Sequence, residues 1–501
     1  MHSEVQSVGP GRVAVFADLH YTCEAAKIKG GILRKAFAAA KDAGADAVVC
    51  AGDMLGNGTV AEATALRSII DAQPLPVWLT PGNAELRTPA ESAAAARALS
   101  MSSELPEGIL TVDSSCGAPS SLPDAPSAGL VITHIPPNAW GQAPYAAWRA
   151  WTATHGNPLV VAGHDHVDDV RDDGCIVLRG LDPDKAIGGP PSFAIFSNGD
   201  GRWRLERKCE IDGIAPETWT DDFRAAFLGH LGISAMSDPF GGLAFATQEA
   251  MPALELRYGS WPEEETPKVI DAIGKWRAAG GRYLSMHLPE VCFGTDGTKG
   301  VDALARSSEL ARKIGCDRVT LHVPRIPVGE YTTHESEVYD GYARGLAPLA
   351  GSGVLVGIEN MHMAPSGETP EHRSFGYTPA ECKAVIGLVR QIPGVTAGYH
   401  CDIGHVRNNA PYSTLFPVSA WYELLGRDCN GMHIHQVTMD ANGVMENHMA
   451  LLGFYDKLIA LSSLVIALRD GLIPPVPMYI EVRRGRGPES YLALKRLVEE
   501  V

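Results

Sequence analysis

Seven polar residues in the first part of the chain have types and spacings that could hold metal ions. They follow short, largely β-branched runs, as in RVAVFADLH, DAVVCAGD and PLVVAGHDH. In chain order they are Asp18, His20, Asp53, Asn83, His134, His164 and His166. Because alternate side chains on an extended segment point the same way, the Asp-x-His and His-x-His pairs can each grip one ion. An Asp between two such clusters can bridge two cations.

Two cations a few Å apart suit phosphate chemistry. Such a pair orients a phosphate group and lowers the pKa of a bridging water, which gives a hydroxide nucleophile near neutral pH. A lone His, or a Gly-Asn turn such as the one at Asn83, would carry no such meaning by itself. The set of strand-end motifs therefore favours a two-metal site that could act on a phosphate group.

The order and identity of these residues resemble the calcineurin-like metallophosphoesterases over about residues 11–208. The resemblance implies two divalent metals, Mn²⁺, Fe²⁺ or Zn²⁺. One would be held by Asp18, His20 and His166, and the other by Asn83, His134 and His164, with Asp53 bridging. It also implies catalytic roles for Asp53, Asn83 and His134.

Ala84 departs from that family, in which the Asn is usually followed by a His that contacts the scissile phosphate. Loss of a general acid typically costs about 10²–10⁴-fold in rate when the leaving group is poor. Three readings stay open: the substrate has a good leaving group, another residue supplies the proton, or the site is weakened. We expect Ala84→His to raise turnover on poor leaving groups.

A second set of polar residues lies at the ends of six later β-rich runs and in the segment after the fifth of these. It comprises His287, His322, Glu359, Asp402, His405, His433, His435, Glu446, His448 and Glu481. In the interior of a barrel, Val, Ile or Leu would be usual, and unpaired charges there would be costly. Metal coordination would explain why so many His and Glu residues occur there.

This second half, about residues 230–501, resembles the xylose-isomerase-like barrels, which include sugar isomerases, epimerases and apurinic endonucleases of the endonuclease IV type. The endonuclease-IV-like ligand set implies up to three metals (Zn²⁺, Mn²⁺ or Fe). The implied groups are His287, His322 and Glu359; Glu359, Asp402, His433 and Glu481; and His405, Glu446 and His448. Glu359 would bridge, and Glu359 and Glu481 are expected to be catalytic. His433 and His435 share a strand face, so either could be the ligand, although the 13-residue offset to Glu446 favours His433.

These residues need elements that bring them together. Strand-helix alternation followed by several strands predicts a four-layer α/β sandwich of the metallophosphoesterase type over residues 1–210. Eight β-rich runs, mostly with helical patterns between them, predict a (β/α)₈ TIM barrel over residues 223–501. The eight runs are 231–236, 253–258, 282–287, 318–323, 354–360, 395–402, 431–436 and 478–482. His400 is expected to be an interior histidine of this barrel.

Composition limits the partners. A formal net charge of −17 disfavours nucleic acid, and no apolar run reaches the ~18 residues that would span a membrane. The ten scattered Cys and the lack of a secretory signal favour a cytoplasmic protein. The expected partner is a small-molecule phosphoester, and a homo-oligomer stays open.

Three functional readings follow from the two ligand sets. The first is a bifunctional phosphoester hydrolase acting on a phosphodiester or a phosphorylated small molecule. The second is a sugar or sugar-phosphate isomerase or epimerase fused to a phosphatase. The third is a binding role for a decayed phosphoesterase, with only the barrel active. The run VRRGRG at 482–487 is either a solvated face or a contact to a substrate phosphate.

Overall fold

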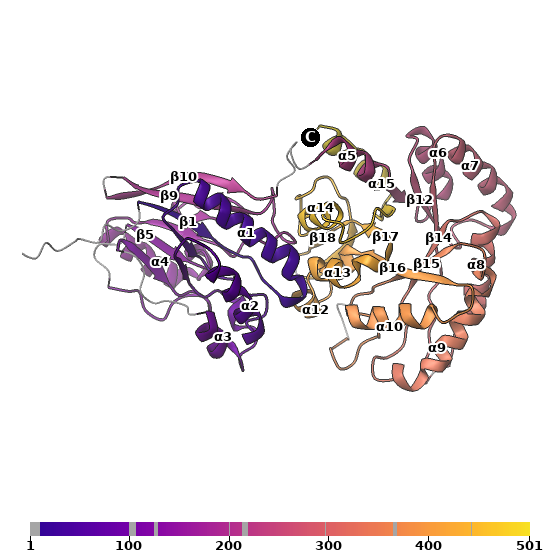
Figure 1. The fold of residues 1–501 in the computed structure, drawn as a ribbon, viewed down its shortest axis with the longest axis horizontal. Helices are drawn as coiled ribbons and strands as arrows, with labels where there is room; N and C mark the ends of the chain where they lie inside the picture. The colour runs from indigo at the N-terminus through magenta and orange to yellow at the C-terminus, as the bar shows by residue number, and fades with distance from the viewer. Residues whose placement is uncertain are drawn as a thin grey trace, which may run out of the picture. The chain divides into compact units, whose positions relative to one another are not determined.

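The computed structural model describes residues 11–99, 107–124, 129–199, 201–212, 219–295, 297–363, 368–441 and 443–500. The chain divides into two compact units, one formed by residues 1–213 with 460–463 and the other by residues 214–459 with 464–501 (Figure 1). Among the described residues, no helix is both long and apolar enough to cross a membrane.

The first unit contains two five-stranded sheets, in the strand orders β10-β9-β1-β2-β3 and β4-β5-β6-β8-β7. The strands of the first sheet are β1 (Arg12–Phe16), β2 (Ala47–Cys50), β3 (Val77–Leu79), β9 (Ser192–Gly199) and β10 (Arg202–Glu210). Those of the second are β4 (Ile109–Val112), β5 (Leu130–Thr133), β6 (Leu159–Ala162), β7 (Asp169–Val170) and β8 (Ile176–Val177). The helices are α1 (Ala26–Asp42), α2 (Val60–Asp71), α3 (Ser92–Leu99) and α4 (Gln142–Thr154).

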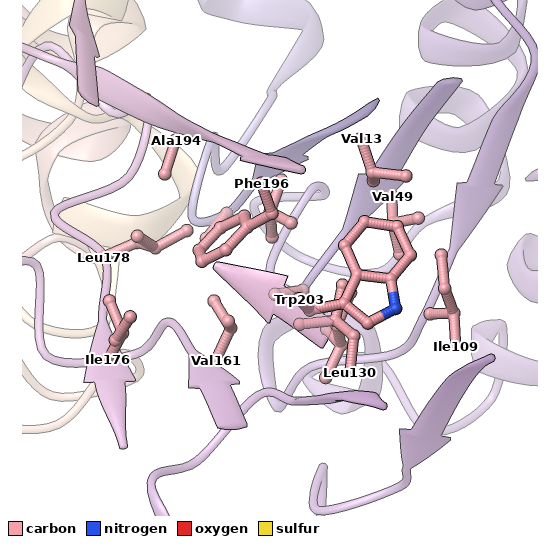
Figure 2. Packing of buried hydrophobic residues seen from close by; sticks show 14 of the residues in the cluster. Val13, Val49, Ile109, Leu130, Val161, Ile176, Leu178, Ala194, Phe196 and Trp203 are labelled. Atoms are coloured by element: carbon pink, nitrogen blue, oxygen red, sulfur yellow. The ribbon is translucent and has the colours of Figure 1, made fainter. Parts of the chain in front are cut away.

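The core of this unit lies between the two sheets. Figure 2 shows Val13 and Val49 of one sheet and Leu130 and Val161 of the other in the same cluster, with Phe196 and Trp203 between them, and all four are buried. On the outer face of the second sheet, the tryptophans of α4 pack against a separate buried cluster. Parallel strands that are covered on both faces read as continuous apolar runs, which is why their sequences lack alternation. The predicted layered α/β sandwich is confirmed.

The second unit is built on a closed barrel of eight parallel strands. They are β11 (Leu231–Ser234), β12 (Ala253–Arg257), β13 (Tyr283–His287), β14 (Arg318–His322), β15 (Leu355–Glu359), β16 (Thr396–Asp402), β17 (Cys429–Ile434) and β20 (Met478–Ile480). The barrel closes where β20 pairs with both β11 and β17. The predicted TIM barrel is confirmed, with each strand inside or overlapping its predicted run.

One helix, α5 (Asp221–Leu228), precedes the first strand of the barrel, and the other helices of this unit follow its strands. These other helices are α6 (Pro239–Gln248), α7 (Thr266–Ala278), α8 (Val301–Lys313), α9 (Tyr331–Leu346), α10 (Pro379–Val389), α11 (Ile403–Arg407), α12 (Tyr412–Leu415), α13 (Val418–Leu425), α14 (Ser462–Arg469) and α15 (Gly487–Glu500). Between β17 and β20 the chain also forms an antiparallel hairpin that the sequence pattern did not predict, β18 (Gln436–Met439) with β19 (Met445–Met449). This hairpin carries Glu446 and His448.

Candidate metal centres

The polar residues of the first unit follow the carboxyl ends of five parallel strands. Asp18, Asp53 and Asn83 follow β1, β2 and β3 of one sheet, while His134 and His164 follow β5 and β6 of the other. Carboxyl ends of parallel strands meet at one edge of a sheet, so the two facing sheets bring these side chains together.

Asp18, His20 and His166 form one group of potential metal ligands. The Nε2 atoms of His20 and His166 are 3.2 Å apart. That separation is close to the ~3.3 Å expected between two nitrogens bound to one tetrahedral ion with bonds of about 2.0 Å. Asp18 and His20 are buried. The donor set and its spacing therefore fit a divalent metal.

A second group contains Asp53, His134 and His164. His134 Nδ1 donates to the carbonyl oxygen of Ala51 at 3.0 Å, which leaves Nε2 free to bind a metal. This Nε2 lies 3.2 Å from Asp53 Oδ1, 3.0 Å from Asn83 Oδ1 and 3.3 Å from His164 Nδ1. All four predicted residues of the second site thus meet at one point.

The two oxygens of Asp53 face the two groups. Oδ1 is the oxygen near His134, whereas Oδ2 lies 3.7 Å from His20 Nε2. This is the arrangement expected of a bridging carboxylate. Burial alone would raise the pKa of Asp53, but the hydrogen bond and charge of His134 lower this pKa to about 2. Asp53 is therefore an anion at neutral pH.

The loops that carry these ligands are strained. Asp18, His20, Asp53, His164 and His166 all have positive φ, between 48° and 78°. A non-glycine residue in this region costs on the order of 1–2 kcal/mol. Such strain persists where the surrounding structure holds it, and it concentrates at functional sites. It aims these side chains at the common centre.

The barrel brings together the residues that end β13, β14 and β15. His287 Nε2 and His322 Nε2 lie 3.3 and 3.2 Å from Glu359 Oε2. Each ring is held by its other nitrogen, since His287 Nδ1 donates to the carbonyl of Leu288 and His322 Nδ1 contacts Glu290 Oε1, both at 3.0 Å. Two oriented imidazoles facing one carboxylate oxygen fit a metal.

The other oxygen of Glu359 faces a second group, formed with Asp402, His433 and Glu481. His433 Nδ1 lies 3.0 Å from Glu359 Oε1, 3.8 Å from Asp402 Oδ2 and 3.3 Å from Glu481 Oε2. All four residues are buried. Burial alone would lower the pKa of His433, but the carboxylates of Glu481 and Glu255 hold this pKa well above its usual value. Glu359 therefore has the geometry of a bridge between two ions.

The structure does not bring together the residues of the predicted third ligand group of the barrel. Among the described residues, His405, Glu446 and His448 form no cluster of ligand atoms, and Glu446 is exposed. His448 lies nearer the other ligands, with Nδ1 3.4 Å from Glu481 Oε2. Within β19, His448 has a positive φ of 58°, and Glu446 is exposed whereas His448 is half-buried.

His435 is a neighbour of the barrel site. Its Nε2 lies 3.1 Å from Asp402 Oδ1, and its Nδ1 accepts the backbone N–H of His448 at 3.0 Å or donates to Gln436 O, also at 3.0 Å. His405 is held by Asp402, whose Oδ1 accepts the backbone N–H of His405 at 2.7 Å and so caps α11. Of the two ambiguous histidines, His433 is the one in the four-residue group.

A family comparison bears on the first unit: the model for the calcineurin-like phosphoesterase superfamily domain matches residues 12–196. Residues 12–196 are a calcineurin-like phosphoesterase domain. The match spans the strands that carry both N-terminal ligand groups of this phosphoesterase domain. No curated protein matches the chain.

The barrel is similar to several solved structures. They include a D-tagatose 3-epimerase-like protein at 18% identity (TM-score 0.39, 54% of this chain and 97% of that chain). An endonuclease IV from Thermus thermophilus matches at 20% identity (TM-score 0.38, 54% and 99%). A xylose isomerase domain protein from Planctomyces limnophilus matches at 15% identity (TM-score 0.39, 54% and 95%).

In the phosphoesterase domain, the side chain of Ala84 is completely buried. Its backbone N–H donates to Asp53 Oδ1 at 2.7 Å. A histidine at this position would overfill a closed space, which typically costs about 1–3 kcal/mol. The expected gain from Ala84→His is therefore offset by a packing cost that the sequence did not reveal.

The next residue, Glu85, has a structural role that sequence reasoning missed. Its buried carboxylate accepts the backbone N–H groups of Asp53 (3.1 Å), Leu55 (2.8 Å) and Gly82 (2.7 Å). It therefore ties the loop after β2 to the loop after β3. Burial and the nearby charge of Asp53 raise the pKa of Glu85 to about 7.

In the barrel, sequence reasoning missed Glu255 on β12. Glu255 is completely buried, and its Oε1 lies 2.7 Å from His433 Nε2. It forms a further potential ligand group with His433 and the buried, interior His400. A Glu between two Leu residues in ALELR was the available signal, because the neighbours of Glu255 point to the opposite face of the strand.

Proposed function

We propose that the chain is a bifunctional metal-dependent phosphoester hydrolase, with one site in the phosphoesterase domain and one in the barrel. One observation carries the proposal in both units. A buried carboxylate, Asp53 in the first and Glu359 in the second, directs its two oxygens at two separate ligand groups. Divalent ions bound there would lower the pKa of a water and stabilise negative charge on phosphate.

The chain's own residues would orient the reactants. In the phosphoesterase domain, Asp53, Asn83 and His134 hold the centre, and the positive charge of Arg87 acts on Asp53 and His164. In the barrel, a carboxylate oxygen of Glu359 and one of Glu481 both lie close to His433 Nδ1. Fixed charges in a buried site stabilise a developing negative charge more strongly than they would in water.

Two sites on one chain suggest two successive steps on a small-molecule phosphoester. One site would open a phosphodiester and the other would remove the phosphomonoester that results.

The test uses the full chain with Mn²⁺ or Zn²⁺, assayed on bis-p-nitrophenyl phosphate and on p-nitrophenyl phosphate. Asp53→Asn and Glu359→Gln each remove one charge from one site and keep its shape. We expect each variant to lose one activity by about 100-fold or more and to keep the other within about twofold. Wild-type protein that cleaves neither ester would overturn the proposal.

A second candidate, a sugar or sugar-phosphate isomerase or epimerase barrel, is favoured by the exposure of Glu446. Without that residue the barrel lacks the third ligand group that set an endonuclease-IV-like site apart. Interconversion of ketoses and aldoses by the wild type, abolished in Glu359→Gln, together with no barrel-dependent diester cleavage, would decide for this candidate.

A further inference from the structure

A cavity of about 490 Å³ opens at the carboxyl ends of β11, β12 and β20. Its lining comes from the segments that follow these three strands, and it includes residues in the first turns of α6 and α15. Val482 and Arg483, which line it, directly follow Glu481 of the barrel ligand group. The cavity therefore begins beside the candidate metal centre, at the end of the barrel where the ligands lie.

Three arginines line this cavity, Arg257 at the end of β12 and Arg483 and Arg484 after β20. Among the described residues, none of these three guanidinium groups forms an ion pair with a carboxylate. Arg486 of the same run differs, because its guanidinium is bonded to Glu489 at 2.7 and 3.1 Å. Three unpaired cations at one cavity, on a chain of net charge −17, mark it as an anion site.

The remaining lining is compatible with an anion. The acidic residue in the lining, Asp238, is engaged, because its Oδ1 accepts the backbone N–H of Gly241 at 2.9 Å as the cap of α6. The loop that carries the arginines is fixed to the hairpin, since the backbone N–H of Arg483 donates to the carbonyl of His448 at 3.0 Å. Neutral hydroxyl groups come from Ser234, Ser237 and Ser260.

We propose that this arginine cavity binds a phosphate group of a phosphorylated small molecule. Guanidinium groups present paired N–H donors that match the oxygens of phosphate, and up to three of them can surround one dianion. A cavity of about 490 Å³ is larger than one phosphate and leaves room for the rest of a small ligand. This phosphate would be an anchor, distinct from the ester that reacts at the metal centre. Only its assignment to the substrate rests on the proposed function.

The test is a calorimetric titration of the full, metal-free chain with inorganic phosphate. Removal of the metals with a chelator, followed by dialysis, keeps phosphate from binding at the metal centres. We expect phosphate to bind with a Kd in the millimolar range or below, and more weakly at high salt. Arg257→Ala, Arg483→Ala and Arg484→Ala should each weaken binding about tenfold, and Arg484→Lys should weaken it less.

The matched control is Arg486→Ala, which removes a neighbouring charge that is already paired with Glu489. It should change phosphate affinity by less than about twofold. Thermal melting of each variant checks that the chain is folded. The proposal is overturned if the metal-free wild type binds no phosphate at tens of millimolar, or if Arg486→Ala weakens binding as much as the other variants. Hydrolase assays of the metal-loaded chain test the proposed function separately, so phosphate binding without hydrolysis would overturn that function alone.

Discussion

At the residue scale, Glu255 sets the chemistry of His433. One oxygen of Glu255 faces His433 Nε2, and the other accepts the hydroxyl groups of Ser285 (3.0 Å) and Thr320 (2.7 Å). Burial alone would raise the pKa of Glu255, but the charge and hydrogen bond of His433 hold it well below its usual value. Glu255 is therefore an anion. It therefore fixes the proton of His433 on Nε2 and leaves Nδ1 for the ligand group with Glu359 and Glu481.

Glu255→Ala should lower the metal affinity of the barrel about 10–100-fold, the usual loss when the partner of a metal-binding histidine is removed. Glu255→Gln keeps an acceptor for His433 Nε2, so its loss should be smaller. The measurement is metal content after equilibration with graded chelator concentrations. Glu249→Ala, which removes a carboxylate paired with Lys495, is the control. Equal metal retention in Glu255→Ala and wild type would contradict this role.

We expect Arg87 to supply part of the phosphate contact that a histidine at position 84 would make. Its charge acts on His20, Asp53 and His164, and its Nη1 donates to the carbonyl of Gly56 at 2.7 Å. Because such a charge stabilises a phosphate in the transition state, Arg87→Ala should lower kcat/KM of the phosphoesterase domain about 10²-fold. Arg87→Lys should recover part of it. An unchanged rate would show that Arg87 stays clear of the substrate.

At the scale of elements, the ends of the strands were predictable and the loops were not. Buried parallel strands give apolar runs, so a polar residue at the end of a run, such as Glu359 or Asp402, marks both the end of the strand and a candidate ligand. The β18–β19 hairpin gave no such signal, because MENHM is mostly polar and lacks a clean alternation. Backbone conformation, such as the left-handed φ of His448, cannot be read from composition. The exposure of Glu446 was likewise not predictable from the sequence.

Glu85 gives the loops after β2 and β3 a dependence on pH. Its folded pKa of about 7 is above its unfolded value of about 4.3, so the folded state holds the proton more tightly. The stabilisation from this proton is complete below about pH 4.3 and is lost as the pH rises to 7. The metal-free domain should therefore become less stable over this interval, by an amount on the order of 1–3 kcal/mol.

Glu85→Gln should remove most of that slope, because a neutral amide does not titrate. Thermal melts of the metal-free full chain at pH 5 and pH 7 measure it. The control is Glu62→Gln, which alters another buried glutamate of the same unit and should keep the wild-type slope. A wild-type slope that survives in Glu85→Gln would assign the effect to another group.

At the scale of the whole molecule, the candidate ligand groups gather carboxyl groups in the interior of both units. Asp18, Asp53, Glu255, Glu359, Asp402 and Glu481 are all buried, and all belong to the candidate ligand groups. Buried carboxylates need cations or protons nearby. Each unit meets that need within its own fold, so metal loading of one unit should not depend on the other.

The number of metal ions per chain tests two points: whether the two units bind metal independently, and whether the predicted third ligand group of the barrel binds an ion. Two groups joined by a bridging carboxylate in each unit predict about four ions per chain, where the endonuclease-IV-like resemblance implied five. Asp53→Asn and Glu359→Gln should each reduce the content to about two, because loss of a bridging charge weakens both neighbouring ions. Glu446→Ala should leave about four, since this exposed side chain belongs to none of the groups among the described residues. Elemental analysis of the purified variants gives these numbers directly, and a content of five that falls to four in Glu446→Ala would mean that metal binding draws Glu446 into a third site.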